Sequence, residues 1–141
     1  MAYRYDGWQL SPKGENMLNP FEQYKKTSVN TMTKGELLIL LFDEAIKKLN
    51  QSKLLMEHND YENANISLEK VRNIFNYLIA TLDDKFQISQ DLTDMYMFFN
   101  TEIIKATSMK STKHIDDILP IIKDLRNTWT EADTIARKIK N

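Results

Sequence analysis

The sequence predicts an all-α fold, an antiparallel up-down-up-down four-helix bundle with a short N-terminal helix or arm packing on it. Residues that break helices are rare, because the 141 residues include only three glycines and three prolines, and most of these lie before residue 21. Apolar residues recur at spacings of three and four over four long segments, which is the period of one helix face. The connections between these segments are short, so consecutive helices should run antiparallel.

The chain divides into three predicted parts. Residues 1–18 carry aromatic side chains without helical or strand periodicity and form a flexible arm. Residues 19–32 form a capping segment too short to be a stable helix alone, and residues 33–141 form the bundle. We expect the first two parts to lie over the bundle as a lid.

The first long helix is predicted over residues 33–57. Thr33 followed by Glu36 forms a capping box, which fixes where the helix begins. The residues that share its inward face, and that should form its part of the core, are Leu38, Leu41, Phe42, Ala45, Leu49, Ser52 and Met56.

This helix is apolar over more of its circumference than one core requires. Leu40 lies opposite the core face on a helical wheel. Two further pairs lie on the flanks, Ile39 with Ile46 and Leu37 with Leu55. A helix that is apolar nearly all round is either central in a larger assembly or meets a partner, so we expect a partner to cover it.

The second and third helices have clear apolar faces. After a turn at residues 58–60, the second helix has a seam of Tyr61, Ala64, Leu68, Val71, Phe75, Leu78 and Leu82. A loop at residues 83–87 follows, and Ser89 is predicted to cap a third helix that ends near Met109. The inner face of that helix comprises Leu92, Met95, Tyr96, Phe99, Ile103 and Ala106.

The fourth helix is predicted to be strictly one-sided. Its apolar strip comprises Ile115, Ile118, Ile122, Leu125, Trp129, Ala132, Ala136 and Ile139. Pro120 lies within this strip, where it removes one backbone hydrogen bond and crowds the preceding turn. We therefore expect either a kink near Asp116 or a helix that begins later.

Apolar residues on the outer faces of the second and third helices are candidate partner-binding residues. Ile66 and Tyr77 lie on the side of the second helix away from its seam, and Met97 and Ile104 lie two turns apart on the third helix. Together with Ile39, Leu40 and Ile46 of the first helix, they form the predicted binding surface.

Composition excludes several classes of function. The chain contains no cysteine, so disulfides, thiolate metal sites and a cysteine nucleophile are ruled out. The net charge of −1 and the absence of a long basic cluster do not favour nucleic-acid binding. The longest apolar run is six residues, at 37–42, far below the roughly 20 that a membrane span needs. The chain also starts without a signal peptide, so we expect a cytoplasmic protein that does not insert into membranes.

The sequence predicts no catalytic site, no metal site and no cofactor. Di-iron helical bundles need inward Glu residues and Glu-x-x-His pairs, whereas this chain has only two histidines, His58 and His114, which we expect on the surface. The acidic pairs at residues 83–84 and 116–117 suit a loop and a helix start. No glycine-rich phosphate loop and no nucleophile elbow is present, so we expect no enzymatic activity.

Several short motifs, in this order and spacing, resemble the flagellin-specific export chaperones of the flagellar secretion system over residues 19–135. They are Asn19-Pro20-Phe21-x-x-Tyr24, Thr33-x-Gly35-Glu36-Leu37 running into Leu41-Phe42-Asp43-x-Ala45, Thr81-Leu82-Asp83, Ile88-Ser89-x-x-Leu92-x-x-x-Tyr96, and Leu125-Arg126-x-x-Trp129. The chain departs from the family pattern at Lys34, where a proline is common, and at Glu44, where a glycine is usual. The resemblance implies that Phe21 and Tyr24 are a functionally central aromatic pair.

The resemblance also implies what the protein does. Members of this family hold the disordered C-terminal part of flagellin in the cytoplasm, prevent premature filament assembly and help present it to the export gate. A disordered partner could bury apolar side chains along the first helix and its neighbours, by lying in a groove and wrapping the bundle. Two alternatives remain: a bundle that self-associates as a structural or adaptor protein, and a small ligand-binding bundle. When free, the chain should be a monomer or a weak homodimer.

Overall fold

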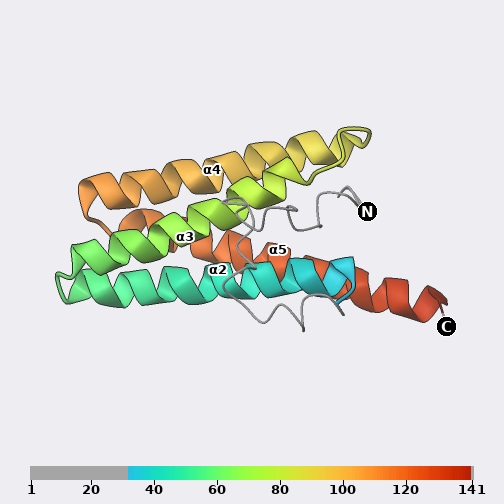
Figure 1. Ribbon diagram of the computed structural model, residues 1–141, viewed down its shortest axis with the longest axis horizontal. Coiled ribbons are helices and arrows are strands. Elements are labelled where there is room, and N and C mark those ends of the chain that lie inside the picture. Colours follow the sequence, from blue (N-terminus) through green and yellow to red (C-terminus); the bar gives the residue numbers. More distant parts are fainter. Residues whose placement is uncertain (1–31, 141) are drawn as a thin grey trace, which may run out of the picture.

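The computed structural model describes residues 32–140 as four α-helices. They are α2 (Lys34–Glu57), α3 (Tyr61–Ala80), α4 (Gln87–Met109) and α5 (Lys113–Lys140). Successive helices reverse direction along the long axis of the molecule (Figure 1). Each helix packs on two others in the order α2–α3–α4–α5–α2, which closes the bundle. The predicted antiparallel four-helix bundle is therefore confirmed, whereas the arm and the capping segment lie outside the described residues.

Helix α2 begins where the sequence predicted. The hydroxyl of Thr33 accepts a hydrogen bond from the backbone N–H of Glu36 at 3.1 Å, and the Glu36 carboxylate accepts one from the N–H of Thr33 at 3.2 Å. This capping box satisfies two backbone donors that have no partner within the helix.

The core is built on the predicted faces. All seven predicted core residues of α2 are buried, and five aromatic rings meet at the centre of the bundle. Phe42 lies 6.2 Å from both Phe75 and Tyr96 and 6.5 Å from Trp129, and Phe75 lies 5.2 Å from Phe99 between ring centroids. Rings at such distances attract one another beyond the effect of area burial, so this cluster ties all four helices together.

The flanks of α2 are covered more fully than the sequence predicted. Leu37 is buried, and Leu40, Ile46 and Leu55 are partly buried against the core. The prediction that α2 is the main uncovered apolar helix is therefore wrong. The reason is that α3 and α5 both pack on α2, so its flanks are in contact as well as its inner face.

Two further predictions about helix faces are wrong. Tyr77, predicted to lie on an outer face, is only 2% exposed, and Ile74 beside it is also buried. Met95, predicted to lie on the inner face of α4, is 36% exposed. Helical periodicity gives the direction of a side chain around the axis of its own helix. Tyr77 and Met95 lie near the edge of the apolar face of their helices, where exposure depends on the neighbouring segments.

Helix α4 begins two residues before Ser89, so Ser89 does not cap it. Phe86 occupies the N-cap position and makes no side-chain capping bond, while the buried Ser89 hydroxyl donates a hydrogen bond to the carbonyl oxygen of Asp83. Ser89 therefore fastens the α3–α4 loop to the helix. At the other end, Lys110 adopts a left-handed conformation with φ 51° and ends α4.

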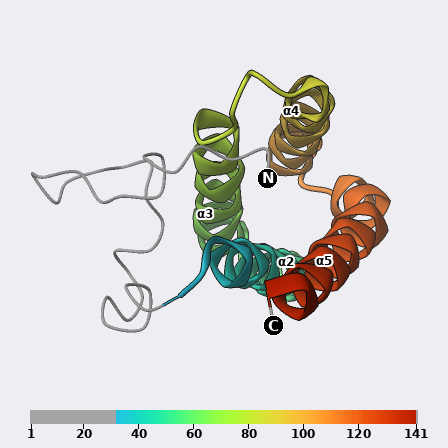
Figure 2. The same ribbon diagram turned by 90° about the vertical axis from the view of Figure 1, so that its right-hand side faces the viewer.

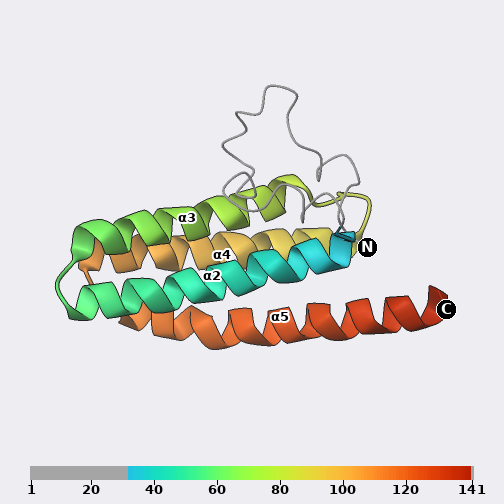
Figure 3. The same ribbon diagram turned by 60° about the horizontal axis from the view of Figure 1, so that its bottom comes forward.

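Helix α5 contains Pro120 and begins at Lys113, so the alternative in which the helix begins after the proline is wrong. Its predicted strip is buried only at Ile115, Ile118 and Ile122, and becomes fully exposed at its end, where Ile139 is 79% exposed. The 28-residue α5 is longer than its neighbours and extends past the end of the bundle (Figure 3), so its last turns have no helix to cover them.

The two histidines differ in their surroundings. His58 is exposed at the C-terminal end of α2, as predicted, and its Nδ1 lies 2.8 Å from the carbonyl oxygen of Leu54. His114 is not a surface residue, as the sequence had suggested, but is half-buried against Glu102 of α4. None of the four described helices has a stretch long and apolar enough to cross a membrane.

Candidate partner-binding surface

The predicted partner-binding residues fall into separate regions. Phe21 and Tyr24 lie outside the described residues. The three residues predicted on α2, Ile39, Leu40 and Ile46, are half-buried rather than exposed. The residues predicted on α3 and α4 are Ile66, Tyr77, Met97 and Ile104, and all of these except Tyr77 are exposed. Burial of Tyr77 raises the pKa of its hydroxyl far above the ordinary value and removes it from any direct contact with a partner.

Ile39 and Leu40 line a groove of about 430 Å³ between α2 and the C-terminal half of α5. The groove is partly polar, since Arg137 pairs with Asp133 at 3.0 Å and with Glu36 at 3.6 Å across it. With Met32 it therefore offers three apolar side chains framed by charges, rather than a broad apolar face.

The approach of the two helices at this groove depends on Gly35. A Cβ atom at this position would overlap the carboxylate of Asp133, so any residue other than glycine would require that side chain to shift. A hydrogen-bonded ion pair between Arg126 and Asp43, at 2.8 Å, joins the same two helices farther along. The carboxylate of Asp43 raises the pKa of the Arg126 guanidinium, which stays charged in any case.

The ion pairs of α5 show that it lies along α2 from its start to its C-terminal half. At its start α5 contacts both neighbours, because His114 faces Glu102 of α4 and Asp116 pairs with Lys53 of α2. Farther along, Arg126 and Arg137 pair with residues of α2. Viewed along the bundle in Figure 2, the C-terminal half of α5 lies beside α2. The N-terminal half of α4 therefore has less cover on the side that faces α5.

The uncovered side of α4 carries exposed apolar side chains. Met95, Phe98 and Met109 are 36%, 45% and 65% exposed, and their spacing places them on one strip with Glu102, which faces α5. Met97 and Ile104 lie two turns apart on another face of the same helix and are also exposed. We call these two strips together the α4 apolar surface, whose five residues are Met95, Met97, Phe98, Ile104 and Met109.

The α4 apolar surface stands on a rigid support. The Asn100 amide donates hydrogen bonds to the side-chain oxygen of Asn76 at 2.9 Å and to the carbonyl oxygen of Arg72 at 3.4 Å, which join α4 to α3. Tyr96 and Phe99, between the exposed residues in sequence, are fully buried in the core. The exposed side chains can therefore meet a partner without movement of the helix.

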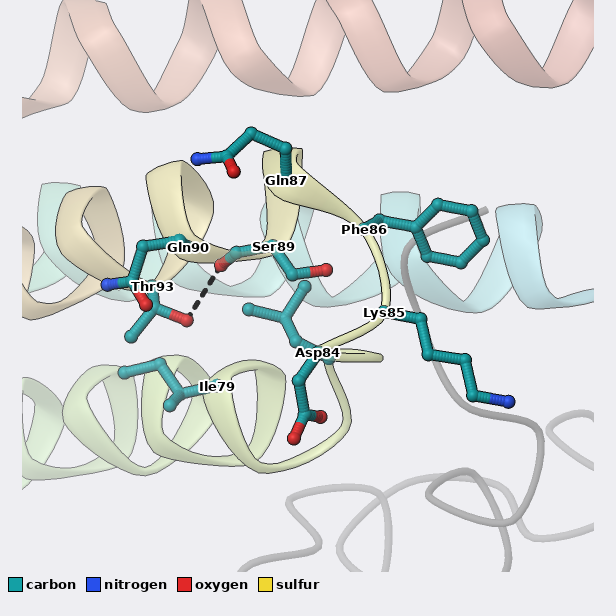
Figure 4. Close-up of a pocket in the computed structure, with 9 residues that line it drawn as sticks. Ile79, Asp84, Lys85, Phe86, Gln87, Ser89, Gln90 and Thr93 are labelled. Atoms are coloured by element: carbon teal, nitrogen blue, oxygen red, sulfur yellow. Dashed lines mark hydrogen bonds between the residues drawn. The ribbon is translucent and has the colours of Figure 1, made fainter.

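A pocket of about 570 Å³ opens at the corner between α3 and α4. Figure 4 shows Ile79, Ser89 and Thr93 around it, with Phe86 turned away, and the Thr93 hydroxyl donates a hydrogen bond to the carbonyl oxygen of Ser89 at 2.8 Å. Its charged lining residues, Asp84 and Lys85, are exposed, and no nucleophile and base are paired among the lining residues. The corner offers polar groups and an exposed Phe86 for binding, but no catalytic arrangement.

Part of the α4 apolar surface was predicted from the sequence. Met97 and Ile104 were recognised by their seven-residue separation on the outer face, and the structure confirms that both are exposed. Phe98 and Met95 were missed, although the spacing of Met95, Phe98 and Met109 on one side of α4 could have identified them. Met95 was assigned to the core because its position also fits the edge of the inner face of the helix.

Comparison with known proteins identifies the family of the chain. The model of the family described as "Flagellar protein FliS" matches residues 17–136. A flagellar secretion chaperone FliS from Bacillus subtilis (strain 168) is 29% identical over 120 residues, which cover 85% of this chain and 90% of that protein. A flagellar secretion chaperone FliS from Escherichia coli (strain K12) is 23% identical over 110 residues, which cover 76% and 81%. The matched region contains all of α2, α3 and α4 and most of α5, and the chain therefore belongs to the FliS family of flagellar export chaperones, which are not enzymes.

Proposed function

We propose that this chaperone binds the disordered C-terminal segment of flagellin, prevents its premature polymerisation and helps deliver it to the flagellar type III export apparatus. Membership of the FliS family supports the export role. The observation that carries the binding proposal is the α4 apolar surface, because its five large apolar side chains and that of Ile88 are exposed on one helix whose inner face is used by the core.

A disordered segment needs several anchors at once to bind this surface. Full burial of one large apolar side chain contributes about 1.5–3 kcal/mol, whereas fixing one backbone residue costs about 1–2 kcal/mol. One exposed residue therefore offsets the ordering of only one or two partner residues. The five residues form two strips on different faces of α4, so an amphipathic helix or an extended segment can contact one strip in succession, and a partner must wrap α4 to reach both.

Other regions are proposed as secondary contacts. Ile39 and Leu40 line the groove beside α5, with Ile46 farther along the same helix, and Ile66 is exposed on α3. Phe21 and Tyr24 remain proposed anchors on the strength of the family resemblance. Contacts in several regions would fit a partner that wraps the bundle, which is a common mode for disordered segments.

The site of action is proposed as the cytoplasm, where flagellin must be kept unassembled before export. A component of the export gate is then the second partner, since a chaperone that only held flagellin would not deliver it. The proposal includes no nucleic acid and no cofactor.

The binding proposal is tested by calorimetric titration of the full chain with a peptide of the flagellin C-terminal segment, with light scattering on the free and mixed samples. Phe98→Glu places a charge in the α4 apolar surface and should weaken binding at least about tenfold, as expected for an aromatic anchor. The matched control is Leu54→Glu, which places the same charge on an exposed leucine of α2 and should change affinity little. No binding by the unaltered chain, or a stable homodimer that buries α4, would favour a self-associating adaptor instead.

A further inference from the structure

Three side chains able to ligate a metal converge where α4 ends and α5 begins. Glu102 lies in the last two turns of α4, and His114 and Asp117 lie one turn apart at the start of α5. One ligand atom from each lies within 4.8 Å of the other two. The short turn between the helices brings these residues together, although they come from different elements.

The separation of His114 and Glu102 suits two ligands of one ion better than a hydrogen-bonded pair. His114 Nδ1 lies 3.6 Å from Glu102 Oε1, which is too long for a hydrogen bond. Two ligands on one tetrahedral ion with bonds of about 2.0–2.2 Å lie roughly 3.4 Å apart. The buried atom His114 Nδ1 has no hydrogen-bond partner among the described residues. A buried polar atom without a partner is costly, so an ion at this point would satisfy it.

Lys105 supplies a positive charge at the same place. Its Nζ lies 3.2 Å from Glu102 Oε2 as an ion pair, and its side chain is 52% exposed. Because the Lys105 side chain is long and about half exposed, its ammonium group can move away from Glu102 when a divalent cation binds.

We propose that Glu102, His114 and Asp117 form a binding site for a divalent transition metal, for which Zn²⁺ is the best match. One imidazole nitrogen and two carboxylates form a donor set that Zn²⁺ accepts, with water completing its coordination. Mg²⁺ and Ca²⁺ prefer oxygen ligands throughout and fit less well. The bound ion would displace Lys105 and fasten the start of α5 to α4.

This site was not predicted from the sequence. The metal-site pattern considered in the sequence was a Glu-x-x-His pair on one helix, whereas the acidic ligand that faces His114 comes from the neighbouring helix. The inference does not depend on the export role, because it rests only on residues at the α4–α5 junction.

The test is zinc binding to the full chain, measured in competition with a chromophoric chelator. We expect one ion per chain, and an affinity reduced at least about tenfold by His114→Ala or by Asp117→Asn. Asp116→Asn is the matched control, because Asp116 is a neighbouring exposed carboxylate that pairs with Lys53 outside the cluster, and it should leave affinity unchanged. Lys105→Met should tighten binding several-fold, since the competing ammonium is removed.

Nuclear magnetic resonance gives an independent readout, because the chain has only two histidines. Added Zn²⁺ should shift the ring signals of His114 and leave those of His58 in place. Asp117→Asn alters an exposed residue, so it tests the site even if His114→Ala does not fold. Equal shifts at both histidines, unchanged affinity in Asp117→Asn, or an equal loss in Asp116→Asn would each overturn the proposal.

Discussion

The same Phe→Ala substitution at two positions distinguishes a residue of the core from a residue of the proposed binding surface. Phe42 is fully buried and its ring lies near those of Phe75, Tyr96 and Trp129, whereas Phe98 is 45% exposed and its ring lies near that of Phe99. Phe42→Ala loses the whole transfer free energy of the ring and leaves a cavity between four helices. We therefore expect a loss of about 3–5 kcal/mol in the free energy of unfolding.

Phe98→Ala removes a ring that solvent already reaches and leaves no closed cavity. About half of its surface is buried, so the loss should be about 1 kcal/mol, taken from 1.5–3 kcal/mol for full burial. Domains of this kind have a total stability of about 5–15 kcal/mol, so only Phe42→Ala should shift the unfolding midpoint strongly. Phe98→Ala should have the larger effect on the affinity of the folded protein for its proposed partner flagellin, because of these two rings only that of Phe98 is open to solvent.

The assay is urea unfolding followed by circular dichroism, which gives both the midpoint and the slope. A loss of more than 3 kcal/mol for Phe98→Ala would refute the assignment of Phe98 to the surface. A loss below 1 kcal/mol for Phe42→Ala would refute the aromatic centre of the core.

Two other predictions concern the start of α2. Gly35→Ala should destabilise the chain, because the new Cβ overlaps the carboxylate of Asp133, and the cost should be smaller in an Asp133→Ala background, where only the Cβ of residue 133 remains close. Equal effects in the two backgrounds, measured by urea unfolding, would contradict this close approach. Hydrogen bonds from Thr33 hold the pKa of Glu36 below its ordinary value of 4.5. Its contribution to stability is therefore present above that pH and is lost as the pH falls through the lower folded pKa, so Glu36→Gln should reduce the decline in stability at acidic pH. Unfolding midpoints measured across that pH range would contradict this if the two proteins declined in parallel.

The sequence by itself determined the local structure. Thr33 and Glu36 marked the start of α2, and the spacing of apolar residues identified four helices and most of their buried faces. These features depend on interactions within one or two turns, which a single stretch of sequence contains. The family followed from motifs of the same local kind, spread in order along the chain.

The tertiary structure decided which faces remain open and which distant side chains meet. Periodicity assigned Leu37 and Tyr77 to outer or flanking positions, yet both are buried, and it assigned Met95 to the core, yet Met95 is exposed. Helix α5 lies along α2 and meets α4 at its start, which brings His114 to Glu102, while apolar side chains elsewhere on α4 stay exposed. A helical pattern specifies directions around its own axis only, whereas exposure and ligand geometry depend on where the neighbouring axes cross, and that is determined by the packing of all four helices together.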